Sequence, residues 1–168
     1  MGEIMIKNNN INKFINWTPA LVWMYVIFMF SSQPASQSNE LSVGFTRLLV
    51  ETLGNLLPFN IETSAISSFV AQLNHIVRKL AHFSVYLVLG VLVSRALVKN
   101  GFKGRVFLIS FLICSTYAVT DELHQLFVPG RGCQIKDVFI DSLGAFVGIL
   151  LNKIDYLLRV FFLHSSYK

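Results

Sequence analysis

Apolar residues occur in four long blocks that are separated by polar segments. The blocks cover residues 14–32, 80–98, 106–122 and 137–152. A membrane with a hydrocarbon core of ~30 Å needs about 20 residues of helix at a rise of ~1.5 Å per residue. The blocks therefore predict four transmembrane helices, the last of which carries Asp141 within its apolar stretch.

The segments outside these blocks complete a single membrane domain. Residues 1–13 are polar and Asn-rich, which predicts a cytoplasmic tail, and residues 153–168 predict a second, amphipathic cytoplasmic tail. In residues 33–79, apolar positions recur at helical spacing in two stretches, the first of which ends at Pro58. This pattern predicts one or two amphipathic helices at the membrane interface. The expected architecture is all-α, with a four-helix membrane domain over residues 14–152.

The first apolar block also has features of a signal peptide. Lys7 and Lys13 precede it, and Ala35 is a small residue near a potential cleavage site. The block is longer than a usual signal core, however, and Gln33-Pro34 is a poor context for cleavage. We therefore favour a retained helix.

Composition supports a membrane protein. Hydrophobic residues make up 54% of the chain and charged residues 14%, with a mean hydropathy of +0.58, whereas soluble domains carry about 25% charged residues. The net charge is +5, but its 14 basic residues are spread along the chain without the aromatic-interleaved cluster of a nucleic-acid surface. We therefore expect membrane lipids, and no nucleic acid, among the partners.

The basic residues instead predict the orientation of the helices. Cytoplasmic loops of membrane proteins carry an excess of Lys and Arg. The short turn at residues 99–105 is strongly basic, so both termini should be cytoplasmic in a multi-pass protein of the cell membrane. The nine basic residues then on the cytoplasmic side are Lys7, Lys13, Arg95, Lys99, Lys103, Arg105, Lys153, Arg159 and Lys168, against five outside: Arg47, Arg78, Lys79, Arg131 and Lys136.

In this topology, polar residues gather at the outer ends of all four spans. Helical spacing places the members of each group on one face of its helix, and ionisable residues at membrane depth are costly unless they are paired. We therefore expect these faces to meet inside the bundle, around a cavity that opens outward. Gly144 and Gly148 continue the face of Asp137 and Asp141, and would let a neighbouring helix approach closely. The candidate binding residues are Ser32, Gln33, Lys79, Tyr86, His124, Gln125, Arg131, Asp137 and Asp141.

Three of the outer residues are candidates for general acid–base catalysis: His82, Asp121 and Glu122. A metal site is not predicted, because no diagnostic ligand spacing is present and Lys79 and Arg131 would oppose a cation. No nucleotide fingerprint is present either, so we expect no cofactor. The alternative to a functional site is a structural network of ion pairs that holds the helices together.

These residues resemble the motifs of the VanZ-like family of bacterial membrane proteins. The resemblance rests on Phe30-Ser31-Ser32-Gln33, on Lys79-Leu80-Ala81-His82-Phe83 with Tyr86, on the string from Thr120 to Arg131, and on Asp137-Val138 with Asp141 and Gly144. Lys79, His82, Tyr86, Asp121, Glu122, Gln125, Arg131, Asp137 and Asp141 are the positions that match the family pattern.

The resemblance implies a link to resistance against glycopeptide antibiotics, notably teicoplanin, because the founding member of the family has that association. Two classes of function follow. In one, the outer cavity binds or modifies a lipid or a lipid-linked cell-envelope molecule, such as an envelope precursor, or a lipophilic glycopeptide. In the other, the protein is a non-catalytic membrane scaffold or amphiphile-binding protein whose polar cluster is a structural ion-pair network.

Overall fold

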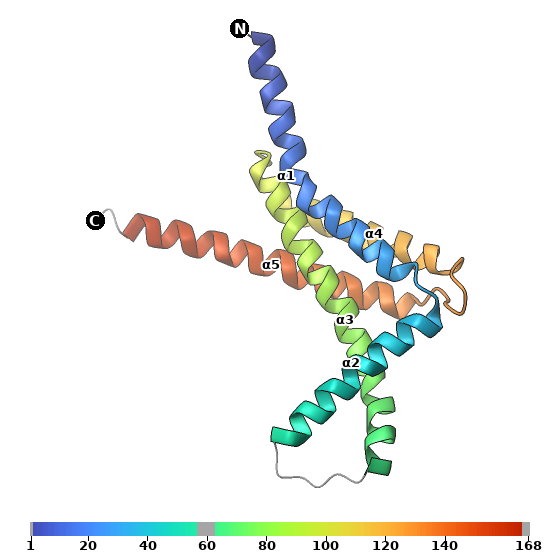
Figure 1. Cartoon of the computed structure of the whole chain (residues 1–168). Helices are drawn as coiled ribbons and strands as arrows, with labels where there is room; N and C mark the ends of the chain where they lie inside the picture. The colour runs from blue at the N-terminus through green and yellow to red at the C-terminus, as the bar shows by residue number, and fades with distance from the viewer. Residues whose placement is uncertain (1, 57–62, 166–168) are drawn as a thin grey trace.

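The computed structural model of the chain describes residues 2–56 and 63–165, and these residues form five helices and no strand (Figure 1). The predicted all-α architecture is therefore confirmed. Side chains are described for residues 12–52 and 70–159. The helices are α1 (Gly2–Ser31), α2 (Ala35–Leu56), α3 (Thr63–Lys99), α4 (Val106–Gln125) and α5 (Ile135–Ser165).

Three segments are long and apolar enough to cross a membrane: Asn12–Ser31, Val70–Lys99 and Val106–Gln125. They belong to α1, α3 and α4, and they agree with three of the four predicted spans. The predicted span at 137–152 is not among them: in the described part of α5, no segment is both long enough and apolar enough to cross. Between Asp141 and Lys153 this helix has an uncharged stretch of only residues 142–152, which at ~1.5 Å per residue covers about 17 Å.

Several helices extend beyond the predicted spans, because the polar segments next to these spans lack a breaking residue. The tail expected at residues 1–13 is helical from Gly2. The second amphipathic stretch of the outer segment is not a separate helix but the beginning of α3, which has no glycine before Gly90 and no proline. The C-terminal tail expected from residue 153 continues α5 to Ser165. The break predicted at Pro58 lies outside the described residues.

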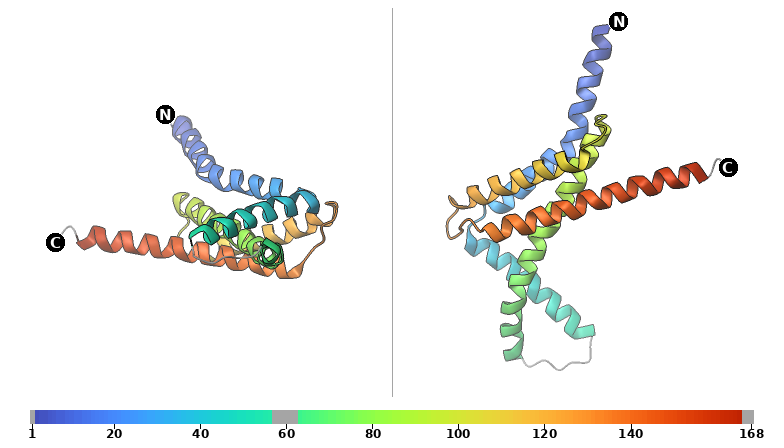
Figure 2. Two further views of the ribbon diagram at one scale, coloured as in Figure 1. Left: turned by 60° about the horizontal axis from the view of Figure 1, so that its bottom comes forward. Right: turned by 180° about the vertical axis from the view of Figure 1, so that it is seen from behind.

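Helix α3 is the centre of the assembly and contacts each of the other four helices. It packs most extensively against α5, which it crosses obliquely (Figure 2). Helices α1 and α4 run toward the same end of the molecule, where the α1–α2 and α4–α5 connections lie together (Figure 1). Helix α2 and the first turns of α3 extend away from the other helices.

Glycines allow the backbones of α3 and α5 to touch. A Cβ atom at Gly144 would overlap the carbonyl oxygen of Phe83, and one at Gly148 would overlap the carbonyl oxygen of Leu87. From the other side, a Cβ atom at Gly90 would overlap the carbonyl oxygen of Ala145. The close approach predicted from the glycine spacing in α5 is thus confirmed.

The surface around this contact is apolar, as expected for helices that face lipid. Large side chains point outward from α1, α4 and α5, among them Phe14, Leu112 and Phe139, with exposed fractions of 68%, 55% and 72%. A contiguous apolar exterior of this kind is rare on soluble monomers. The interior is correspondingly small and is built around Tyr86, Leu89, Val93, Leu97, Ala20, Ile27, Cys114, Ala118 and Ala145.

We predict that Gly148→Ala destabilises the fold. The added methyl group would meet a backbone carbonyl that cannot rotate away, and overpacking of this kind costs roughly 1–3 kcal/mol. The matched control is Gly44→Ala in α2, where nothing lies within 4 Å of the added atom. That change should be neutral or should stabilise by about 0.5–1 kcal/mol, because alanine favours helix over glycine. Thermal unfolding of the purified protein in detergent compares the two, and equal melting temperatures would contradict the close contact.

Candidate functional site

The ends of α1 and α4 are joined by hydrogen bonds between polar side chains. The Gln125 Nε2 amide donates to the Ser31 hydroxyl at 3.1 Å, and both residues are buried, with exposed fractions of 5% and 4%. In each helix the adjacent residue makes a second contact: the Ser32 hydroxyl and His124 Nε2 lie 3.1 Å apart, and the His124 ring packs against Phe28. These contacts fix the C-terminal turn of α4 against α1.

Two polar contacts join α3 to the first turns of α5: an ion pair, and a histidine–carboxylate contact that is an ion pair when the imidazole is protonated. Lys79 Nζ pairs with Asp137 Oδ1, and His82 Nδ1 lies 3.3 Å from Asp141 Oδ1. Asp137 lies in the first turn of α5, where the helix dipole also favours a negative charge. Asp141 is completely buried, and neither of its oxygens accepts a hydrogen bond from the described residues. The structural ion-pair network is therefore present in part.

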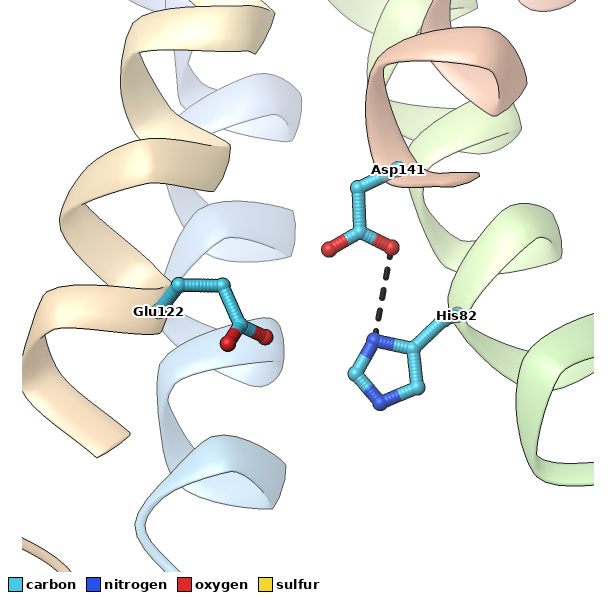
Figure 3. A group of neighbouring side chains, drawn as sticks. All are labelled: His82, Glu122 and Asp141. Carbon is cyan, nitrogen blue, oxygen red and sulfur yellow. Dashed lines mark ion pairs between the residues drawn. The ribbon is translucent and has the colours of Figure 1, made fainter. Parts of the chain in front are cut away.

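Glu122 approaches the second of these contacts from α4. Its exposed fraction is 1%, and its Oε2 accepts a hydrogen bond from the backbone N–H of Gln134 at 2.8 Å. Its Oε1 has no hydrogen-bond partner within the described residues. One ligating atom from each of His82, Glu122 and Asp141 lies within 4.8 Å of the other two. Figure 3 shows these three side chains pointing into one space between α3, α4 and α5.

The connection between α4 and α5 reaches back to the beginning of α2. The Ala35 N–H donates to the carbonyl oxygen of Pro129 at 3.1 Å, and Arg131 Nη2 donates to the carbonyl oxygen of Phe30 at 3.3 Å. Gly130 has a φ of 75°, a left-handed conformation that favours glycine and bends the chain before Arg131. This bend directs the guanidinium toward the end of α1.

The charge of Arg131 interacts with those of Asp121, Glu122 and Arg78. Burial lowers the pKa of its guanidinium below the ordinary value, and the neighbouring Arg78 lowers it further. Asp121 and Glu122 raise that pKa. A guanidinium stays protonated even so, which makes Arg131 a permanent positive charge. Its Nε is buried and has no hydrogen-bond partner in the described part of the chain.

A cavity of about 540 Å³, here called the α2 cavity, lies beside this group. Helix α2 lines one side of it, and residues from α1, α3, α4 and the α4–α5 connection line the rest. Nine lining residues are apolar: Ile27, Phe30, Leu41, Phe45, Leu49, Val77, Leu80, Ala81 and Val85. The polar lining residues are Ser31, Gln33, Ser38, Ser42, Arg78, His82, Ser84, Tyr86, Asp121, Gln125 and Arg131.

The predicted site residues separate into three groups in space. Gln33, Tyr86, Gln125 and Arg131 line the α2 cavity, together with His82 and Asp121. Behind His82 lie Glu122 and the residues of the two polar α3–α5 contacts, Lys79, Asp137 and Asp141. Ser32 and His124 contact each other at the α1–α4 contact and do not line the cavity.

Ser31 is one of the polar cavity residues that the sequence prediction missed, together with Ser38, Ser42, Arg78 and Ser84. It was grouped with Ser32 and Gln33 but was not singled out. Ala20, Ile27 and Ser31 are separated by seven and four residues and are all buried. This helical spacing would have placed Ser31, rather than Ser32, on the inner face of α1.

The VanZ/LLP1 family matches the chain over residues 16–159. This range includes all of the side chains that form the cavity and the two polar α3–α5 contacts. No curated protein and no solved structure matches the chain.

We predict that Lys79→Met destabilises the protein, because Asp137 would remain buried without its partner. The Asp137 side chain is only 8% exposed. Breaking a fully buried ion pair lowers the free energy of unfolding by ~3–5 kcal/mol. Because the Lys79 side chain is 24% exposed, we expect a smaller loss of about 1–3 kcal/mol. The double change Lys79→Met with Asp137→Asn should restore most of this loss.

The control for this prediction is an exposed pair in the same two helices. Arg95 and Asp155 lie 3.9 Å apart and are 51% and 44% exposed. Arg95→Met should therefore cost about 0–1 kcal/mol. Thermal unfolding measures all three variants, and a loss for Lys79→Met no larger than for Arg95→Met would show that the α3–α5 pair is not a stabilising contact.

Proposed function

We propose, for a chain that belongs to the VanZ/LLP1 family, that the α2 cavity binds an anionic amphiphile at the outer face of the cell membrane. The amphiphile is a lipid or a lipid-linked cell-envelope molecule. The observation that carries the proposal is the composition of the cavity: apolar side chains from α1, α2 and α3 line it together with two neighbouring guanidinium groups.

The apolar walls suit a hydrocarbon chain. Leu41, Phe45 and Leu49 project from one face of α2, with exposed fractions of 62%, 54% and 39%. Phe30 and Leu80 line the cavity from α1 and α3. Since α2 is amphipathic, it can lie at the membrane interface with this face toward acyl chains. The volume of about 540 Å³ lies within the ~300–1,000 Å³ that is usual for ligand sites.

The two guanidinium groups suit an anionic head group. Arg78 and Arg131 both line the cavity, and a guanidinium binds a phosphate or a carboxylate through two parallel hydrogen bonds. Arg131 takes part in no ion pair within the described residues, so its charge is available to a ligand. This supports binding over the alternative in which Arg131 balances Asp137 or Asp141.

Chemical modification of the bound molecule is a second candidate, favoured by the position of His82. Its imidazole lines the cavity, and its Nδ1 lies 3.3 Å from Asp141. A histidine oriented by a carboxylate is a common general base, and Asp121 lines the same cavity. Turnover of the bound molecule, lost in His82→Gln, would distinguish modification from binding.

A contribution to teicoplanin resistance is a narrower proposal that rests on family membership. A lipophilic glycopeptide offers an apolar chain and polar groups together, which is the combination the α2 cavity suits. Protection could also arise from binding of the envelope precursor. Growth with teicoplanin, with and without the gene, tests this point separately from lipid binding.

We also propose that α5 is a fourth span and that both termini are cytoplasmic. Three crossings would leave the termini on opposite sides, against the basic residues at 99–105 and 153–159. Asp137 and Asp141 do not face lipid, since both are buried against α3. The charges that interrupt the apolar stretch of α5 are thus compatible with a helix that crosses inside the bundle.

We predict that Arg131→Lys weakens binding of phosphatidylglycerol by at least about tenfold, because an ammonium cannot make the paired hydrogen bonds of a guanidinium. The fold should survive, since only one hydrogen bond from Arg131, to Phe30, is lost. Binding is measured with the purified protein and lipid in mixed micelles, with melting curves alongside. Arg105→Lys is the control: it precedes α4, whose 20 residues separate it from Arg131 by about 30 Å.

If Arg131→Lys and Arg131→Ala both bind this lipid like the wild type, Arg131 is not a ligand-binding residue. If, in addition, Arg131→Ala lowers the melting temperature and Arg131→Lys does not, the role of Arg131 is to stabilise the α4–α5 connection.

The topology is testable with the native cysteines. Cys133 is exposed in the α4–α5 connection, and Cys114 is buried. In intact cells, a membrane-impermeant maleimide should therefore label the wild type and not Cys133→Ser. Lys103→Cys in the Cys133→Ser background should react only after permeabilisation. A fluorescent reporter fused after Lys168 should be active, because it would lie in the cytoplasm. If Cys133 is labelled from outside but this reporter is inactive, α5 does not cross the membrane.

A further inference from the structure

We propose that His82, Glu122 and Asp141 bind one divalent metal cation, of the Zn²⁺ or Mn²⁺ class, between α3, α4 and α5 (Figure 3). The proposal does not depend on the binding of an amphiphile, and each of the two can fail alone. The sequence does not suggest this site, because its three ligands come from three helices without a diagnostic spacing.

The three side chains lie near enough to share a metal ion. Their ligating atoms lie within 4.8 Å of one another. Two ligands of a tetrahedral ion bound at ~2.0–2.2 Å are about 3.3–3.6 Å apart, so side-chain movements of about 1 Å would complete the site. Figure 3 shows the carboxyl groups of Glu122 and Asp141 and the imidazole of His82 directed toward a common space.

The carboxylate oxygens at this place lack other partners. Asp141 is 0% exposed, and neither of its oxygens has a hydrogen-bond donor in the described part of the chain. Glu122 uses Oε2 to accept from the backbone of Gln134, while Oε1 remains without a donor. Leaving a buried carboxylate unsatisfied is costly, and a shared cation would satisfy Glu122 Oε1 and an oxygen of Asp141 at once.

The charges nearby favour a cation. With a neutral imidazole at His82, Glu122 and Asp141 carry two negative charges, which a divalent ion neutralises. Of the basic residues that would oppose it, Lys79 pairs with Asp137, and Arg131 forms no ion pair with Glu122 or Asp141.

The ligand types restrict the ion. Imidazole suits Zn²⁺ and related transition metals, and carboxylates also suit Mn²⁺. Three protein ligands leave at least one coordination position open, as in catalytic rather than structural zinc sites. Because His82 also lines the α2 cavity, the ion would lie beside that cavity. There, an oxygen of an anionic ligand would be able to complete the coordination shell.

The test is metal binding by the full chain, purified in detergent and stripped with a chelator. Zn²⁺ and Mn²⁺ are titrated separately by calorimetry, and retained metal is counted by mass spectrometry after dialysis. Co²⁺ serves as a spectroscopic probe of the ligand set. We expect one ion per chain and a rise in melting temperature of the wild type on metal addition. Loss of an outer-shell partner weakens a metal site ~10–100-fold, so His82→Gln, Glu122→Gln and Asp141→Asn should each weaken binding more than about 100-fold.

Three controls separate this site from surface binding and from the proposed lipid site. His75→Gln and Asp155→Asn remove an exposed histidine and a surface carboxylate, and Arg131→Lys changes the proposed head-group site. All three should bind metal like the wild type. Glu122→Gln keeps an oxygen for the Gln134 N–H, so it should fold even where His82→Gln does not. Wild type without bound metal, or Glu122→Gln with unchanged stoichiometry and affinity, would overturn the proposal.

Discussion

The backbone contact between α3 and α5 determines the geometry of the polar site. Gly144 lies against the carbonyl of Phe83, and Gly148 lies against that of Leu87, with no side chain between the two helices at either point. His82 precedes Phe83, and Asp141 lies one turn before Gly144. The glycine contact therefore sets the distance of 3.3 Å between His82 and Asp141. Membrane helices gain little hydrophobic free energy by associating, because lipid is already apolar. Their association therefore depends on close packing, which small residues allow.

The helices, and the faces on which their polar residues lie, were largely predictable from the sequence. Spacing by three and four residues placed Lys79, His82 and Tyr86 on one face of α3, and the structure has them facing the cavity and the ion pairs. The ends of helices were less predictable. Polar stretches such as residues 2–13 read as tails or loops, yet a helix continues through them because nothing in them breaks it.

Contacts that involve the backbone could not be predicted. Glu122 is held by the N–H of Gln134, and Arg131 by the carbonyl of Phe30. Every residue has these backbone groups, so a sequence carries no sign of which ones a distant side chain will meet. His124 illustrates the same limit. Its spacing from Asp121 suggested the inner face of α4, but contacts with Ser32 and Phe28 hold it at α1.

Glu122 is the residue for which a purely structural explanation is weakest. Its one hydrogen bond, from Gln134, needs a carbonyl-type oxygen and no charge, so glutamine would serve as well. A carboxylate that is 1% exposed instead carries a desolvation cost that the nearby ion pairs do not offset, since Lys79 is engaged with Asp137. The same reasoning applies to the second oxygen of Asp141, which His82 does not reach. Two buried carboxyl groups with oxygens that folding leaves without partners, beside a histidine that lines a cavity, are what the proposed cation would explain and helix packing does not.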